Sequence, residues 1–150
     1  MRVFVVAGAG FLLAVLWFDL MFDVQVLPYR GEGLPEPVLA SIAAYYRRVT
    51  TGARPMNRLV AAAMLATIAT LVAEVAGNAG RHWPGWVSLV LVGSAVTLAG
   101  GRTVPNAVRL GAGNDPPPRQ AALARSICRD HLVCFAAISA ALLLQLAWAR

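Results

Sequence analysis

Two carboxylates and one imidazole are the side chains of this chain best suited to proton chemistry, and they lie in very apolar surroundings. Asp19 and Asp23 are four residues apart near the end of the apolar stretch Phe4–Val26, so on a helix they face the same way. His131 lies just before the apolar stretch Leu132–Ala149. Ionisable residues within membrane helices usually face the bundle interior and meet a partner there. We therefore expect these three residues to form a catalytic site.

Further polar side chains stand at the matching ends of the other apolar stretches, and they supply candidate substrate-binding groups. Two readings of this convergence remain open. An aspartate can pair with an arginine merely to hold the helices in register, or the polar ends can line a ligand pocket. The number of polar side chains exceeds what pairing needs, which favours a pocket. The candidate substrate-binding residues are Tyr46, Asn57, Arg58, Arg102, Asn106 and Arg125.

Four apolar stretches must position these groups. A bilayer core of about 30 Å requires a helix of about 20 apolar residues. The composition, 59% hydrophobic with a mean hydropathy of +0.65, leaves little polar surface for a soluble globule. We predict an all-α fold, an integral membrane four-helix bundle forming a single domain of residues 1–150, in which the third stretch continues helically as far as Pro105. The stretches are Phe4–Val26, Leu59–Ala76, Trp86–Gly100 and Leu132–Ala149.

A short amphipathic helix is predicted between the first and second spans, from Glu36 to about Thr50. An apolar stripe formed by Val38, Leu39, Ile42, Ala43 and Tyr46 is typical of a helix lying in the membrane interface. After the third span, Pro105-Asn106 and then Gly111–Pro118 predict a loop, because proline and glycine disfavour a helix. The last helix is expected from Arg119 onward.

All 13 basic residues of the chain are arginines, and their distribution predicts the orientation. The termini and the short link Gly77–Gly85 hold 3 of them, whereas the two longer loops hold 10. The positive-inside rule then places both long loops in the cytoplasm and both termini outside, in a bacterial-type inner (plasma) membrane. The net charge of +6 is explained by anchoring to lipid phosphates rather than by nucleic-acid binding. We expect membrane lipid and a lipophilic small molecule as partners, and no nucleic acid.

The spacing of the cysteines, histidines and small residues bears on metal binding and on oligomerisation. Cys128, His131 and Cys134 are spaced three apart, but a straight helix cannot bring all three to one ion, so we expect no metal and two free, packed cysteines. A haem held by His82 and His131 is excluded because the topology places them at opposite faces. Near the face of His82, Glu74 and Asn78 predict a helix-end pair or a minor second site. The small-residue face with Gly93 and Thr97 suits either internal packing or a homo-oligomer.

Several short motifs, taken in order, resemble the anthrone-oxygenase-like family of small four-helix membrane proteins. They are a glycine-rich first span, Tyr45-Tyr46-Arg47 with Pro55-Met56-Asn57 before the second span, Val104-Pro105-Asn106 after the third, and Arg125 with Asp130-His131 before the fourth. The resemblance covers most of the chain. It implies a membrane-embedded oxidoreductase that oxidises an anthrone or quinol-like aromatic with molecular oxygen and without a cofactor. It also implies site roles for Asn106, His131 and Arg125.

That chemistry suits the residues. An anthrone is a carbon acid, so His131, Asp23 or Asp19 can remove a proton while an arginine stabilises the enolate. Two other classes of function remain: a non-enzymatic binding or transport protein for an anionic amphiphile or lipid, and a structural accessory subunit. An aromatic molecule that copurifies with the protein would favour the enzyme, and a phospholipid would favour the binder.

Overall fold

The computed structural model describes residues 1–31, 33–52, 54–77 and 83–148, and within these ranges it is helical with no strand. Helices of ordinary α geometry are joined by one short 3-10 segment and two π-helical segments. In chain order the elements are α1 (Arg2–Asp23), η1 (Val24–Val26), α2 (Glu36–Arg47), η2 (Arg48–Gly52), α3 (Arg54–Gly77), α4 (Trp83–Leu98), η3 (Ala99–Thr103), α5 (Val104–Ala112) and α6 (Pro117–Ala147).

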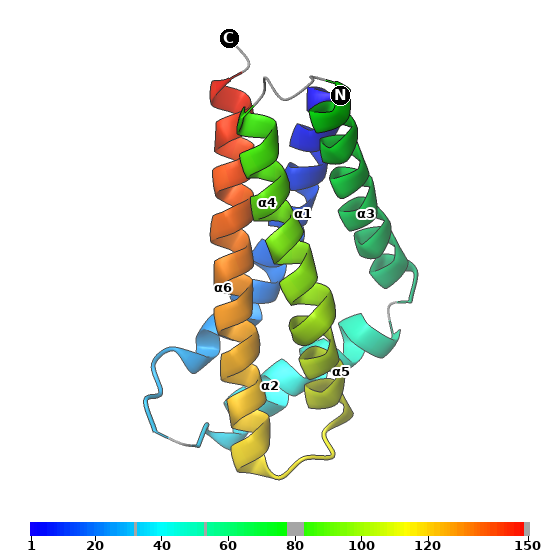
Figure 1. Ribbon diagram of the computed structural model, residues 1–150. Helices are drawn as coiled ribbons and strands as arrows, with labels where there is room; N and C mark the ends of the chain where they lie inside the picture. Colours follow the sequence, from blue (N-terminus) through cyan, green and yellow to red (C-terminus); the bar gives the residue numbers. More distant parts are fainter. Residues whose placement is uncertain (32, 53, 78–82, 149–150) are drawn as a thin grey trace.

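Four long helical stretches form a bundle in which α6 packs along α1 and α4, and α3 packs against α1 and α4 (Figure 1). The stretches Arg2–Val26, Pro55–Gly77, Trp83–Ala112 and Pro117–Ala147 are each long and apolar enough to cross a membrane. The α1 helix begins, and α6 ends, at the same end of the bundle (Figure 1). The helices α2 and α5 lie at the other end. The predicted all-helical fold with four helices long and apolar enough to cross a membrane is confirmed.

Large apolar side chains cover the outside of the bundle, which is typical of helices that face lipid. Trp17, Phe18 and Met21 of α1 are all more than half exposed. Small residues lie where helices meet. A side chain at Gly8 would collide with Thr67 of α3, so this glycine allows α1 and α3 to approach closely.

The third span is longer than the sequence indicated. The prediction that this helix ends at Pro105 is wrong. The helix passes from α4 through the π-helical η3 into α5 and ends at Ala112. Pro105 lies in the first turn of α5, where its lack of an N–H is tolerated because the π segment has already interrupted the regular pattern. Gly113 ends the helix with a left-handed φ of 69°. The predicted loop is correspondingly shorter, and α6 begins at Pro117 rather than at Arg119.

The helix predicted between the first two spans is present as α2, but its apolar stripe is covered by protein. Ile42 and Tyr46 are buried in a cluster with Leu110 of α5 and Ile127 of α6. The contact between α2 and α5 is tight, since a Cβ at Gly111 would lie 2.7 Å from the backbone nitrogen of Arg47. The α2 helix is therefore fastened across this end of the bundle, next to the end of α1 and the start of α6 (Figure 1).

Candidate functional site

A buried hydrogen-bonded group of side chains lies where α1, α2 and α6 meet. Asp23 is completely buried, and both of its carboxylate oxygens have partners. Its Oδ1 accepts a hydrogen bond of 2.6 Å from the Tyr46 hydroxyl, and its Oδ2 lies 2.6 Å from His131 Nδ1. The Tyr46 hydroxyl also lies 3.4 Å from the same imidazole nitrogen. Asp23 thus fixes both the phenol and the imidazole ring.

A second carboxylate faces the opposite edge of the imidazole. Asp19 Oδ2 lies 3.9 Å from His131 Nε2, which is too far for a hydrogen bond. The other Asp19 oxygen accepts a 2.6 Å hydrogen bond from the Tyr45 hydroxyl, and the Tyr45 ring stacks on Phe22 with centroids 4.1 Å apart. The Asp19 side chain is 17% exposed, whereas that of Asp23 is fully buried. The imidazole therefore has a closed side at Asp23 and a more open side at Asp19.

We call these five residues, Asp19, Asp23, Tyr45, Tyr46 and His131, the acid–imidazole cluster. The local sequence explains how they meet. The two aspartates are one helical turn apart on α1, and the adjacent tyrosines of α2 each reach one of them because α2 crosses the end of α1. Tyr46 was predicted from the sequence as a site residue, whereas Tyr45 was not. The signal was present, since the two hydroxyl-bearing aromatics match the two aspartates in number and α2 follows α1 in the chain.

The electrostatics keep both tyrosines protonated. Burial raises the pKa of Tyr45 and of Tyr46 above its usual value, and the negative charges of Asp19 and Asp23 raise each pKa further. Each hydroxyl therefore remains a hydrogen-bond donor to its aspartate. In this arrangement the carboxylates accept on one side from phenols and on the other side face the imidazole.

The arginines expected at the site lie elsewhere. Arg102 of η3 forms an ion pair of 3.1 Å with Asp130 and donates a hydrogen bond to Ser126. Arg125 donates hydrogen bonds to the backbone oxygens of Tyr29 and Gly33, which fastens the loop after η1 to α6. The partners that the described structure gives to the two aspartates are tyrosine and histidine, so neither aspartate is paired with an arginine among the described contacts.

The remaining candidate residues lie near this end of the bundle, and none of their described hydrogen bonds involves the cluster. Asn57 donates a hydrogen bond of 2.8 Å to the Thr50 backbone oxygen, linking the start of α3 to η2. Arg58 is exposed on α3, and Asn106 is half-buried on α5. The structure thus brings together Asp19, Asp23, Tyr46 and His131 from the sequence-based set, and places the arginines and asparagines around them.

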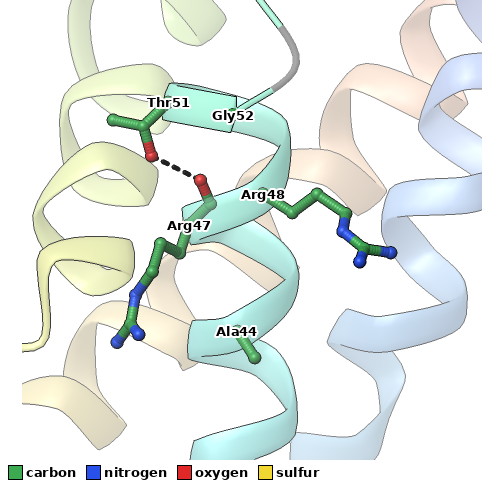
Figure 2. Close-up of a pocket in the computed structure, with 5 residues that line it drawn as sticks. All are labelled: Ala44, Arg47, Arg48, Thr51 and Gly52. Carbon is green, nitrogen blue, oxygen red and sulfur yellow. Dashed lines mark hydrogen bonds between the residues drawn. The ribbon is translucent and has the colours of Figure 1, made fainter.

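A hollow on the protein surface lies beside this cluster rather than in it. It runs along the outer face of the end of α2 and of η2, and we call it the α2-end groove (Figure 2). Arg47 reaches from it toward α5, where its Nε donates a 3.0 Å hydrogen bond to the Gly111 backbone oxygen. The Thr51 hydroxyl donates to the Arg47 backbone oxygen. The groove is lined by Ala44, Arg47, Arg48, Thr51 and Gly52.

The cysteines and the second candidate site add no further ligand group. Cys128 and Cys134 are free and buried, and the Cys134 thiol donates to the Ala95 backbone oxygen. Within the described ranges, no three His, Cys, Asp or Glu side chains are grouped so that they could hold a metal ion. Glu74 is buried near the far end of α3, while its predicted partner Asn78, like His82, lies outside the described residues.

Comparison with known proteins yields no relative from which a role can be transferred: no protein-family model, no curated protein and no solved structure matches this chain. The chemistry must therefore be argued from the cluster itself. An imidazole that is fixed through Nδ1 by a carboxylate, with Nε2 directed toward a more open side, is an arrangement suited to accepting and returning a proton.

Proposed function

We propose that the acid–imidazole cluster is the active site of a membrane-embedded, cofactor-independent oxygenase that acts on a lipophilic aromatic substrate of the anthrone or quinol type. One observation supports this most directly. His131 is held at Nδ1 by Asp23 at 2.6 Å, while its Nε2 has no hydrogen bond to Asp19 at 3.9 Å. The imidazole is therefore oriented on one side and has an unfilled nitrogen on the other, where a substrate proton can be accepted.

For an anthrone, the proposed reaction begins when His131 Nε2 takes one proton from the ring CH₂ group and leaves an enolate. The electron-rich anion transfers electrons to molecular oxygen and forms a C–O bond, and the imidazolium returns its proton to the peroxide. Loss of water, with the second hydrogen of the CH₂ group, breaks the O–O bond and leaves a ketone. One CH₂ group and one O₂ thus give one C=O group and one water, and no external reductant is needed.

The proposed substrate class agrees with the character of the site. The cluster combines two carboxylates with a histidine and two phenols, so it suits a neutral weak acid better than an anion. The stacked Phe22 and Tyr45 rings beside Asp19 offer an aromatic surface. The alternative of a binding or transport protein for an anionic amphiphile is less well supported here, because the arginines that would attract an anion lie outside the cluster.

The proposal includes the location of the protein. We infer a multi-pass protein of a bacterial-type inner membrane, with both long loops in the cytoplasm and α2 at the membrane interface. The α1 helix begins at the same end of the bundle as that at which α6 ends, which supports an even number of membrane crossings (Figure 1). The outward position of Thr97 and the open space beside Gly93 on α4 leave that face available for a homo-oligomer.

The decisive experiment compares His131→Gln with Asp130→Asn in purified protein reconstituted in nanodiscs. Oxygen uptake and ketone formation are measured with anthrone as the probe. We expect His131→Gln to lower turnover by about 10²-fold or more, because removal of a positioned base has an effect of this size. Asp130→Asn changes the neighbouring carboxylate, which faces Arg102, and should retain most activity.

Two outcomes would contradict the proposal. Unchanged turnover in His131→Gln, with the variant folded as judged by its melting temperature, would remove the base from the mechanism. Absence of any oxygen uptake by the wild-type protein, together with a copurifying phospholipid instead of an aromatic molecule, would favour the binding protein. A structural accessory subunit would show neither uptake nor a bound small molecule.

A further inference from the structure

The α2-end groove is positively charged. Its five lining residues, spaced along one face of α2 and η2, include two arginines and no acidic side chain. Other arginines nearby are neutralised: Arg102 pairs with Asp130, and Arg109 forms two hydrogen bonds with Asp115. The arginine charge that remains exposed at the groove therefore suits an anionic ligand.

The two arginines of the groove are also held differently. The Arg47 guanidinium is fixed by its Nε bond to Gly111, which leaves its terminal nitrogens available to a ligand. Arg48 is exposed and extends along the opposite edge of the groove from Arg47 (Figure 2). The hydroxyl of Thr51 and the small residues Ala44 and Gly52 complete a mainly apolar lining. An anionic group with an apolar body fits this combination better than a bare ion does.

The position of the groove identifies the source of such a ligand. The α2–η2 segment connects the candidate spans Arg2–Val26 and Pro55–Gly77, so it lies at the end of two membrane helices. Arginines at that depth meet lipid phosphates. We infer that the α2-end groove binds the headgroup of an anionic membrane phospholipid, with its phosphate at Arg47 and Arg48. This inference rests on the membrane location and is independent of the proposed oxygenase activity.

Occupancy of the groove would also affect the acid–imidazole cluster, because the two share a helix. Tyr46 directly precedes Arg47, and the Thr50 hydroxyl donates to the Tyr46 backbone oxygen. Asn57 in turn links Thr50 to α3. A lipid that steadies the end of α2 therefore steadies Tyr46 and, through it, Asp23. The groove is thus also a site through which the lipid composition can regulate the cluster.

The test is native mass spectrometry of the purified full chain in detergent, titrated separately with phosphatidylglycerol and with phosphatidylcholine. We expect phosphatidylglycerol to bind more tightly, and Arg48→Gln to weaken it about fivefold, the effect of losing one arginine at a lipid surface. Arg129→Gln is the matched control, since Arg129 is exposed on α6 away from the groove lining. It should leave the affinity for phosphatidylglycerol unchanged.

Three results would overturn the inference. Equal weakening by Arg129→Gln would show diffuse surface charge instead of a site. Equal affinity for the two lipids in the wild type would remove the role of headgroup charge. Displacement of phosphatidylglycerol by millimolar inorganic phosphate would indicate a free-phosphate site. The melting temperature of Arg48→Gln in phosphatidylcholine serves as the folding control, and loss of oxygenase turnover would not affect this readout.

Discussion

Asp130 and His131 are neighbours in the sequence, yet they belong to two different polar clusters. His131 is enclosed with Asp23 and Tyr46 between α1, α2 and α6, and its partners are buried. Asp130 is also buried, but its partner Arg102 on η3 is 45% exposed. Successive residues of a helix point about 100° apart, which explains how one turn of α6 serves both clusters.

The difference between these clusters shows which of them is suited to chemistry. In the Arg102–Asp130 pair, a guanidinium and a carboxylate meet with the arginine partly in solvent, so the pair mainly fastens η3 to α6. In the acid–imidazole cluster, the side chains are groups that can exchange protons, and among the described residues the hydrogen bonds of His131 are all made at Nδ1. The first cluster therefore joins two helical segments, whereas the second is the one to which we assign the proposed chemistry.

The largest expected effect separates the two clusters by stability. Asp23→Ala leaves His131 and Tyr46 buried without their acceptor, so we expect it to lower the free energy of unfolding by about 3–5 kcal/mol. Asp130→Ala leaves Arg102 able to reach solvent, and we expect a loss of only about 1 kcal/mol. Reversible unfolding in mixed micelles measures both values. Similar losses for the two variants would show that burial does not distinguish the clusters.

An intermediate effect is expected from the contact that holds α2 against α5. A methyl group at Gly111 would lie 2.7 Å from the Arg47 backbone nitrogen, and backbone cannot move aside as a side chain can. Gly111→Ala should therefore destabilise the protein by about 1–3 kcal/mol and displace Tyr46. Melting temperature and oxygen uptake are the measurements.

Gly93→Ala is the matched control for this prediction. The space beside Gly93 is open, and alanine is favoured over glycine within a helix, so this variant should be neutral or slightly more stable. If both alanine variants behave alike, the close approach of α2 and α5 does not support the acid–imidazole cluster.

The smallest effect concerns the pair of Arg109 and Asp115. Like Arg102–Asp130 it joins an arginine to an aspartate, but it lies at the protein surface. Hydrogen bonds from Arg109 hold the pKa of Asp115 below its ordinary value of 3.8. Because the folded pKa is lower than the unfolded one, the pair stabilises the fold above the unfolded pKa and loses this effect as the pH falls through the folded pKa. Arg109→Gln should raise the Asp115 pKa toward 3.8, measured by carboxyl carbon NMR. An unchanged pKa would mean that the pair does not form in solution.

Much of the architecture could be predicted from the sequence, because helix length and apolar content act locally. Four apolar stretches required four long helices, and the structure has four. The prediction failed at Pro105. Whether a proline stops a helix depends on whether the preceding turn can absorb the missing hydrogen bond, and here the π-helical η3 does so.

The candidate site was predictable only in part. Asp19, Asp23 and His131 could be singled out because charge within apolar helices is rare and requires a partner. The identity of that partner could not be read from residue types, since arginine and tyrosine both stood at the right depth. Packing of α2 on α5 through Gly111 decided in favour of the tyrosines, because it brings Tyr45 and Tyr46 against the end of α1.

The sequence by itself determined that this chain forms apolar helices with polar groups gathered at one end, because hydropathy and charge are properties of each segment alone. Only the tertiary structure decided which polar groups meet. It directs His131 toward Asp23 and Asp130 toward Arg102, and it leaves Nε2 of the imidazole without a hydrogen bond to Asp19. A difference of a few tenths of an ångström in the distance between two side chains decides whether they form a hydrogen bond. For side chains on different helices, that distance is set only when the helices pack together.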